Sequence, residues 1–436
     1  MLPMKSSMLW KNWSGSVKFN PKEVMYPSTI DEIVTIVKKA NSEKKKIRVV
    51  GSSHSFTPLI ATNDYLISLD RLNGIISIDK EAQIAEIWAG TKLEQLGHEL
   101  YEAGYSQENL GDINVQSVAG AFLTGTHGTG ISHGILATQI EMMTIVLPTG
   151  DVLECSKTKN TDFYRAIGVS LGLMGIVVKL KIRIKPATTY RYESKKVNFR
   201  ELSSNLEKYK NEYEHFEFYL FPYSENVQIK MMNQTRSKKH SYKYEKWKVA
   251  TIENKAFWLL SEFSRNFPKS SHQISKISAS SVPSSSMIGP SHELFATIRT
   301  VKFNEMEYSI PAEHMKDATS EIQEEIIQKQ FNVHFPIECR FVKKDNFLIS
   351  PASMRDSAYI AIHMYKGMPH HEYFKRIEEI LQSYNGRPHW GKMHTMNREK
   401  LLNLYPLLPN FLNMRKEIDK NNIFVNAYLT KLFEIE

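Results

Sequence analysis

The segment "RVVGSSHSFTPLI" at residues 48–60 leads from an apolar strand pattern into a loop of small residues that contains one histidine. A strand that feeds glycine and serine presents backbone N–H groups without bulky side chains, which suits a phosphate group. The loop lacks the G-x-G-x-x-G spacing of a dinucleotide-binding fold and the Gly-Lys-Ser/Thr of a P-loop. Small residues alone would hold a phosphate, so His54 requires a separate explanation.

The residues on either side of this segment predict alternating helices and strands. Upstream, Ser28 or Thr29 caps a predicted helix whose apolar stripe consists of Ile30, Ile33, Val34 and Val37. Downstream, "SVAGAFLTGTHGTG" at 117–130 is a second loop of small residues. The density of glycine indicates that a ligand or another part of the backbone approaches this loop closely.

The composition is that of a soluble globular protein with two or three domains. Of 436 residues, 42% are hydrophobic and 24% are charged, and no apolar run reaches the length of a membrane span. Cys155 and Cys339 are too few and too far apart for a disulfide framework or a zinc ribbon. The N-terminus lacks the charged and apolar regions of a secretion signal. We therefore expect a cytoplasmic protein with no transmembrane segment.

The net charge is +9, and basic runs lie at 42–48 and 236–248. The first run precedes a predicted strand and is interpreted as a solvated helix end. The second interleaves Tyr and Trp with Lys, which fits either a nucleic-acid surface or a polar insertion on an exposed edge. A basic excess also helps to attract anionic ligands. The charge does not decide the function, and we expect no nucleic-acid partner.

Changes in composition divide the chain into three parts. Residues 1–186 are predicted to form one domain of helices, strands and glycine-rich loops. Residues 187–385 lose glycines and gain aromatic residues, and their pattern predicts a mostly antiparallel sheet flanked by helices. Within this part, the serine-rich segment 275–291 is predicted to be a mobile loop. Residues 386–436 contain the compact motif "RPHWGKMHT" and a helical tail.

Polar residues on predicted strands supply further candidates. In "FPIECRFV" at 335–342, Glu338 and Arg340 point away from the apolar face, roughly 7 Å apart along the strand. They form either a surface ion pair or a pair that lines a cleft, and the residues alone favour the surface pair. His363 is by itself best interpreted as a core or edge histidine. His389 and His394 lack a third ligand at a recognisable spacing, so we expect no metal site.

Taken together, these motifs resemble those of one enzyme family. The ordered set "VVGSSHSF", "SVAGAFLTGTHGTG", "GLMGIVVKLKI", "FNEMEYSIP", "ECR" and "PHWGK" is similar to the aldonolactone and alditol oxidases of the vanillyl-alcohol oxidase superfamily. That group contains the L-gulonolactone, D-arabinono-1,4-lactone and xylitol or alditol oxidases. The resemblance implies an α+β fold, in which a two-subdomain α/β FAD-binding domain of the PCMH/VAO type is joined to a substrate, or cap, domain with a large antiparallel sheet flanked by helices.

The resemblance also explains His54. In this family the histidine of the loop is joined covalently to the 8α-methyl group of FAD, while the loop backbone holds the pyrophosphate. The residue before that histidine is often glycine, where this chain has Ser53. The implied cofactor-binding residues are Gly51, Ser52, Ser53, His54, Ser55, Phe56, Ser117, Gly120, Gly125, Thr126, His127, Gly128, Ile176, Val177 and His389. The implied catalytic residues are Glu338, Arg340, Lys392, Ser117 and His363.

The implied reaction oxidises a hydroxyl-bearing carbon of a sugar-derived lactone by hydride transfer to flavin N5, after which O₂ is reduced to hydrogen peroxide. Arg340 and Lys392 would favour a developing alkoxide, and Glu338 would position Arg340. The proton acceptor is not assigned. The alternatives are an alditol oxidase of the same fold, a dehydrogenase with another electron acceptor, and a flavin-binding protein without turnover. The joint presence of Glu338, Arg340 and Lys392 argues against the last.

Overall fold

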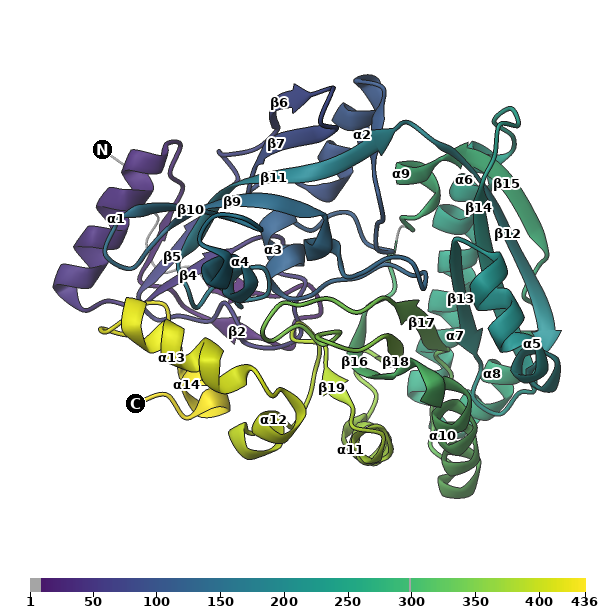
Figure 1. Ribbon diagram of the computed structural model, residues 1–436. Coiled ribbons are helices and arrows are strands. Elements are labelled where there is room, and N and C mark those ends of the chain that lie inside the picture. The colour runs from purple at the N-terminus through teal and green to yellow at the C-terminus, as the bar shows by residue number, and fades with distance from the viewer. Residues whose placement is uncertain (1–8, 298) are drawn as a thin grey trace.

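The first sheet holds the strand that leads into the histidine-containing loop. The computed structural model describes residues 9–297 and 299–436 (Figure 1). The sheet is parallel, in the order β3-β5-β4, and its strands are Glu23–Met25 (β3), Ile47–Val50 (β4) and Tyr65–Ser68 (β5). Helix α1 (Ile30–Glu43) begins after Thr29, whose side chain accepts a hydrogen bond from the backbone N–H of Glu32. The predicted cap at Thr29 is confirmed. Of the predicted stripe, Ile33 and Val37 are buried, whereas Ile30 and Val34 are half-buried at its edge.

A second, antiparallel sheet follows, in the order β10-β9-β11-β7-β6, with β8 paired to β11. Its strands are Ile75–Asp79 (β6), Ile84–Trp88 (β7), Tyr105–Gln107 (β8), Ile140–Val146 (β9), Val152–Ser156 (β10) and Ile176–Pro186 (β11). The helices of this part are Leu93–Glu102 (α2), Val118–Leu123 (α3) and Thr161–Ile167 (α4), with a 3₁₀ turn at Leu136–Gln139. The hairpin expected around residues 148–150 joins β9 to β10.

The third sheet is large and antiparallel, as predicted, in the order β15-β12-β14-β13-β17-β18-β16-β19. Its strands are Thr189–Asn198 (β12), His215–Leu220 (β13), Asn226–Gln234 (β14), Ser285–Pro290 (β15), Phe303–Pro311 (β16), Ile337–Val342 (β17), Ser357–Tyr365 (β18) and Arg387–Pro388 (β19). Its helices include Phe199–Glu212 (α5), Ser291–Leu294 (α9), Met315–Lys329 (α10) and His371–Ser383 (α11).

Strand register separates the large sheet into an apolar and a polar face. On the apolar face, Phe216 of β13 stacks on Tyr209 of α5, with ring centroids 5.6 Å apart. On the polar face, Glu217 of β13 stands opposite Arg340 of β17. Because side chains alternate along each strand, the charged residues of β13, β17 and β16 all reach the same side of the sheet. The α+β class and the large antiparallel sheet predicted for the middle part of the chain are therefore confirmed.

The C-terminal segment returns to the first sheet. Helices α12 (Arg398–Leu404), α13 (Leu408–Ile418) and α14 (Ala427–Phe433) follow β19, and α13 and α14 lie beside the N-terminal strands in Figure 1. The backbone N–H of Ile47 donates to the carbonyl of Ile423 at 2.6 Å. The C-terminal segment thus contacts the strand that feeds the loop at 51–55.

The expectation of a mobile loop at 275–291 is wrong. Helix α8 (Ser271–Ser280) covers its first part, and β15 pairs with β12 along six residues in its second part. Serine is a weak helix former but a compatible one, and here Ser271 and Ser275 are buried against the rest of the domain. The basic segment at 236–248 ends in helix α6 (Tyr242–Lys248), which continues through a π turn (Val249–Glu253) into α7 (Asn254–Asn266).

Helix α7 contacts the rest of the protein through small and aromatic side chains. Its two buried residues are Ser261 and Ser264. Nε2 of His334 lies 3.0 Å from the Ser261 hydroxyl, and the Phe257 ring packs edge-on against Phe335 with centroids 4.8 Å apart. His334 is 0% exposed, and this burial lowers the pKa of its imidazole to about 4.

The depressed pKa of His334 predicts a loss of stability in mild acid. Between pH 6.5 and 4 the unfolded chain takes up a proton at this imidazole that the folded chain does not, so the free energy of unfolding falls as pH falls. The full shift corresponds to about 3 kcal/mol. His334→Gln is expected to flatten this dependence by about one proton in urea unfolding followed by circular dichroism. Parallel pH curves for the variant and the wild type would contradict the assignment.

Candidate active site

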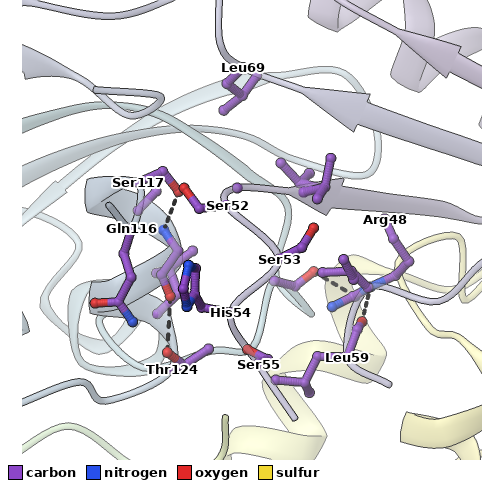
Figure 2. Close-up of a pocket in the computed structure, with 18 of the residues that line it drawn as sticks. Arg48, Ser52, Ser53, His54, Ser55, Leu59, Leu69, Gln116, Ser117 and Thr124 are labelled. Atoms are coloured by element: carbon purple, nitrogen blue, oxygen red, sulfur yellow. Dashed lines mark hydrogen bonds between the residues drawn. The ribbon is translucent and has the colours of Figure 1, made fainter. Parts of the chain in front are cut away.

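The loop at 51–55 forms one wall of a cavity with about 1120 Å³ of empty space. The other walls come from the segment after β5, from the start of α3 and from the loop that enters β11 (Figure 2). Ser117 caps α3, and its hydroxyl accepts a hydrogen bond from the backbone N–H of Gly120. A Cβ atom at Gly51 would lie 2.2 Å from Oγ of Ser117, so this position has room only for glycine.

Ser53 adopts a backbone conformation that favours glycine. Its φ is +56°, in the left-handed region that carries a steric cost for residues with a Cβ atom. Two tryptophan segments hold it there: Nε1 of Trp10 donates to the Ser53 hydroxyl at 2.9 Å, and the Trp13 backbone N–H donates to the Ser53 carbonyl at 2.8 Å.

Arg48 places a buried positive charge in the wall of the first cavity. Its guanidinium donates to the carbonyls of Leu59, Leu171, Gly172 and Phe424, at distances of 2.6 to 3.3 Å. Burial lowers its pKa to about 10, which still leaves it charged at neutral pH. No acidic side chain of the described residues forms an ion pair with it. A charged donor without a counter-ion fits an anionic group in this cavity.

His54 lies where the first cavity meets a second one, because its side chain lines both. Its ring stacks on Trp13 with centroids 5.5 Å apart. Burial, reinforced by the charge of Lys392, lowers the pKa of His54 to about 4. At neutral pH the imidazole is therefore uncharged and keeps a free lone pair on one ring nitrogen.

The second cavity has about 720 Å³ of empty space and is strongly charged. Nε of Arg340 donates to Glu217 at 2.8 Å, and its Nη2 lies 2.8 Å from Asp112 and also contacts Glu338. Glu338 and Arg340 are 5% and 7% exposed, so the surface ion pair that the residues alone favoured is not found. Both charges are therefore enclosed within the protein.

The charges around Arg340 are balanced by nearby cations. Nη2 of Arg299 lies 2.6 Å from Asp112, and Nζ of Lys230 lies 3.1 Å from Glu217. The Tyr219 hydroxyl donates to Glu338 at 3.0 Å. Although burial opposes it, the three carboxylates raise the pKa of Arg340 well above its ordinary value. Arg340 is therefore a permanent cation and not a proton acceptor.

A second charged group is centred on Glu305 of β16. Nζ of Lys392 lies 2.6 Å from one oxygen of Glu305, and Nε2 of His363 lies 3.5 Å from the other. Nδ1 of His363 faces the Pro336 carbonyl at 3.0 Å. Burial works against ionisation, but Lys392 and His363 together hold the pKa of Glu305 well below its usual value. Glu305 thus fixes the position of the Lys392 ammonium group.

A third group joins His127, Glu307 and His389. Nδ1 of His127 lies 2.8 Å from the Gly128 carbonyl, and Nε2 lies 3.0 Å from Glu307. Both ring nitrogens face oxygen acceptors, which requires a proton on each of them or one on Glu307. Burial opposes ionisation, but His127 outweighs it and lowers the pKa of Glu307 to about 2, so Glu307 is a carboxylate at neutral pH. His389 is neutral, because burial lowers its pKa to about 4.

The structure brings most of the predicted site residues to these two cavities. Those that line the first are Gly51, Ser52, Ser53, His54, Ser55, Ser117, Gly120, Ile176 and Val177. Those that line the second are His54, Ser55, Phe56, Thr126, His127, Glu338, Arg340, His389 and Lys392. Gly128 lines a neighbouring third cavity together with Asp112 and Arg340. Gly125 packs against Pro351, and His363 is buried behind Glu305, as a core histidine would be.

Several charged residues in or beside the second cavity were not predicted. Glu305 and Glu307 alternate with buried Met306 and Tyr308 in β16, and Glu217 alternates with phenylalanines in β13. That alternation is the signal that selected Glu338 and Arg340, and it could have found these glutamates too. Asp112 and Arg299 lie in loops, where the sequence carries no comparable pattern.

Unpaired polar atoms show that the cavities fit a large polar ligand. Oε1 of Gln116 and Oγ1 of Thr126 are buried and have no hydrogen-bond partner among the described residues. Gln116 lines both cavities and Thr126 lines the second. With the exposed backbone of Gly51–Ser55 and the charge of Arg48, these atoms match a molecule with a diphosphate and a hydrogen-bonding ring system.

Comparison with known protein families agrees with this geometry. Residues 21–156 match the family described as "FAD binding domain", and residues 180–432 match the family described as "D-arabinono-1,4-lactone oxidase". The chain belongs to the D-arabinono-1,4-lactone oxidase family. It is an FAD-dependent oxidoreductase of the vanillyl-alcohol oxidase type, and the resemblance inferred from its motifs is confirmed.

Relatives in this lactone oxidase family span almost the whole chain. The L-gulono-1,4-lactone dehydrogenase of Mycobacterium tuberculosis is 31% identical over 427 residues, which cover 98% of this chain and 99% of the relative. The L-gulonolactone oxidase of Mus musculus is 31% identical over 437 residues, covering 97% and 98%. The cholesterol oxidase structure from B. sterolicum superposes with a TM-score of 0.85 at 18% identity, over 99% of this chain and 97% of the other, which shows a shared fold.

Proposed function

We propose that this protein oxidises a hydroxyl-bearing carbon of a sugar-derived lactone of the L-gulono- or D-arabinono-1,4-lactone type, with FAD bound covalently through His54. The position of His54 carries the proposal. It joins the small-residue cavity, which suits the nucleotide part of FAD, to the charged cavity, which suits a polyhydroxylated substrate. We assign residues 1–186 to FAD binding, 187–385 to the substrate domain and 386–436 to a segment that returns Lys392 to the site.

Each group of residues has a role that follows from its contacts. FAD supplies the hydride acceptor, which no side chain can provide. His54 would hold FAD at its 8α-methyl position, where the uncharged imidazole has a ring nitrogen available as the point of attachment. Arg340 and Lys392 stabilise negative charge on the substrate oxygen as its proton leaves. Glu338 and Glu305 position these two cations, and Glu338 also accepts a hydrogen bond from substrate.

The same contacts limit which residues can act as the proton acceptor. Arg340 is excluded, since its pKa is raised by Asp112, Glu217 and Glu338. Glu307 is held ionised beside His127 and faces the second cavity. His389 is neutral at pH 7 and lines the same cavity. Both are weak bases, because their pKa values are lowered to about 2 and about 4, and Nδ1 of His389 already accepts a hydrogen bond from the Gly391 backbone N–H at 3.0 Å. We therefore assign no proton acceptor, and we assign Ser117 to the FAD cavity that it lines.

The electron acceptor that we propose is O₂, which is reduced to hydrogen peroxide. A dehydrogenase is the second candidate, because the Mycobacterium tuberculosis relative carries that name. An alditol such as xylitol is the alternative substrate, since lactone and polyol oxidases share the motifs around Glu338, Arg340 and Lys392. We place the protein in the cytoplasm, because Cys155 and Cys339 are both free thiols.

His54→Ala is expected to break the covalent link and leave FAD in the cavity by non-covalent contacts alone. Acid denaturation should then release yellow flavin from the variant, while the wild-type polypeptide retains it. The absorbance of the precipitate and the supernatant measures this directly. Trp13→Ala is the control, because it removes the stacking partner of His54 and leaves the imidazole. Flavin that stays attached to His54→Ala would overturn the linkage.

The overall proposal is tested with a panel of aldonolactones and alditols, with two assays for each compound. Anaerobic bleaching of the flavin absorbance reports substrate oxidation, and peroxide formation in air reports the acceptor. We expect lactones to bleach the flavin and to form peroxide. Bleaching without peroxide would select the dehydrogenase, bleaching by alditols alone would select the alditol oxidase, and no bleaching by any compound would contradict the proposal.

A further inference from the structure

The third cavity lies over the polar face of the large sheet and has about 740 Å³ of empty space. Its floor is formed by side chains of β12, β13, β14 and β15. Helices α6 and α9 and the segment that follows α9 form its roof, and both helices lie beside these strands in Figure 1. Most of the surface of this cavity is apolar. The lactone oxidase chemistry proposed above uses none of its apolar residues.

Strand register places a charged row and an apolar row side by side in this cavity. In the charged row, Glu217 of β13 stands opposite Arg340 of β17. Two residues along the strands, and therefore on the same face of the sheet, Tyr192 of β12 stands opposite Met232 and Met287. The floor of the cavity thus changes from charged to apolar within about 7 Å, the distance between side chains on one face of a strand.

The apolar residues of the cavity form a cluster that is separate from the main core of the protein. Leu110, Met232, Leu294 and Phe295 are 5% to 8% exposed and pack together in this cluster. Apolar side chains that enclose empty space lose contacts that close packing would give them, and the loss destabilises the protein. An apolar group bound in the cavity would restore these contacts. The lining therefore indicates an apolar ligand group.

The third cavity meets the second one at a single ion pair. Asp112 and Arg340 line both cavities. The first cavity, which suits the nucleotide part of FAD, shares none of its described lining residues with the third. An electron acceptor must approach the flavin itself, whereas a substituent of the substrate needs only to adjoin the substrate. The position of the third cavity thus fits a part of the substrate better than an electron acceptor.

The other end of the third cavity lies between the two helices of its roof. Lys246 of α6 and Glu293 of α9 line this end and form an ion pair, and their side chains are 32% and 25% exposed. A Cβ atom at Gly289 of β15 would lie 2.9 Å from Cγ of Tyr242, so α6 packs closely on the sheet. The cavity therefore extends from the buried Arg340 to a half-exposed ion pair under a closely packed helix.

We propose that the third cavity is an apolar subsite of the active site, which binds an alkyl or aryl substituent carried by the sugar-derived substrate. The polar part of that substrate lies in the second cavity, and the substituent passes beside Asp112 and Arg340 into the third. The preferred substrate is then an amphipathic sugar derivative and not the unsubstituted lactone. This inference rests on the proposed function and deepens it by naming the chemical class of the substituent.

The test measures anaerobic flavin reduction by an unsubstituted lactone and by its butyl and hexyl ethers, in two series that carry the chain at the terminal hydroxyl or at a ring hydroxyl. Burial of each methylene strengthens binding about threefold to fourfold, so the second-order rate constant for one hexyl ether should exceed that of the parent lactone about a hundredfold. Reduction by the parent without any gain from the chain would overturn the inference alone, and this is the result expected if the cavity serves an electron acceptor. No reduction by the parent or by any ether would contradict the proposed function itself.

Two variants locate the substituent. Ala296→Trp fills the third cavity and Met287→Gln makes its lining polar, and neither residue lines the first or the second cavity. Each variant should lower the ratio of the hexyl rate constant to the parent rate constant by about tenfold. Met354→Gln changes a methionine that is 68% exposed elsewhere on the protein, and it should keep the wild-type ratio. If Ala296→Trp fails to retain flavin, Met287→Gln decides the test. A wild-type ratio in Met287→Gln would place the substituent outside the third cavity and overturn the proposal.

Discussion

Replacing Arg340 with alanine is expected to lower the rate of flavin reduction by substrate by about a thousandfold. The guanidinium lines the second cavity, and three carboxylates raise its pKa well above the ordinary value, so it stays charged. It is the cation best placed to stabilise negative charge on a substrate oxygen. Its removal also leaves Asp112, Glu217 and Glu338 close together with less positive charge, which should cost about 3 to 5 kcal/mol of stability.

Two further variants separate these effects. Arg340→Lys keeps the positive charge but cannot donate to Glu217 and Asp112 at once, so we expect an intermediate loss of rate and a smaller loss of stability. Arg376→Ala removes an arginine from a half-exposed ion pair with Glu325 and should leave the rate unchanged. Stopped-flow reduction of the bound flavin measures the rate, and thermal unfolding measures stability. A normal rate in folded Arg340→Ala would remove this residue from the mechanism.

Replacing Lys392 with methionine is expected to have the next largest effect, a loss of about a hundredfold in the same rate. Methionine keeps much of the volume but leaves the buried Glu305 without the ammonium group at 2.6 Å. Since Lys392 and His363 hold the pKa of Glu305 down, that pKa should rise in the variant. An ionised Glu305 would then oppose negative charge on the substrate, so the variant should recover activity as pH falls.

The pH dependence distinguishes this role from simple packing. Wild-type activity should not rise toward low pH, whereas that of Lys392→Met should. Glu305→Gln combined with Lys392→Met is expected to remove the dependence on pH. Lys400→Met changes an exposed lysine of α12 that contacts Gln382, and it serves as a control within the same segment. Unchanged turnover in Lys392→Met would mean that the "PHWGK" motif contributes to packing and not to catalysis.

Local patterns predicted the fold and part of the site because each depends on neighbours in sequence. The cap at Thr29, the strand before Gly51 and the alternation around Glu338 are of this kind. The position of His54 between two cavities follows from such patterns only with the help of the family resemblance. Ser53 shows the reverse case, since a serine with φ of +56° gives no local sign of its conformation.

The remaining features depend on contacts between distant segments. Whether Glu338 and Arg340 are exposed is decided by Asp112 and Glu217, which come from a loop and from another strand. The serine-rich segment 275–291 is ordered because β15 pairs with β12, almost a hundred residues earlier in the chain. Composition describes the segment itself and contains no information about that partner. The burial of Glu338 and Arg340 and the ordered structure of segment 275–291 are therefore known only from the three-dimensional structure.

The four carbonyls that surround Arg48 have a consequence for biosynthesis. Arg48 is made early, but its partner Phe424 is made 376 residues later. Until the C-terminal segment leaves the ribosome, the cation lacks one of its acceptors and the strand before Gly51 lacks its contact with Ile423. Contacts between such distant residues form slowly. We therefore expect the nascent chain to remain open at this point, and the uptake of FAD to be a post-translational event that follows release of the complete polypeptide.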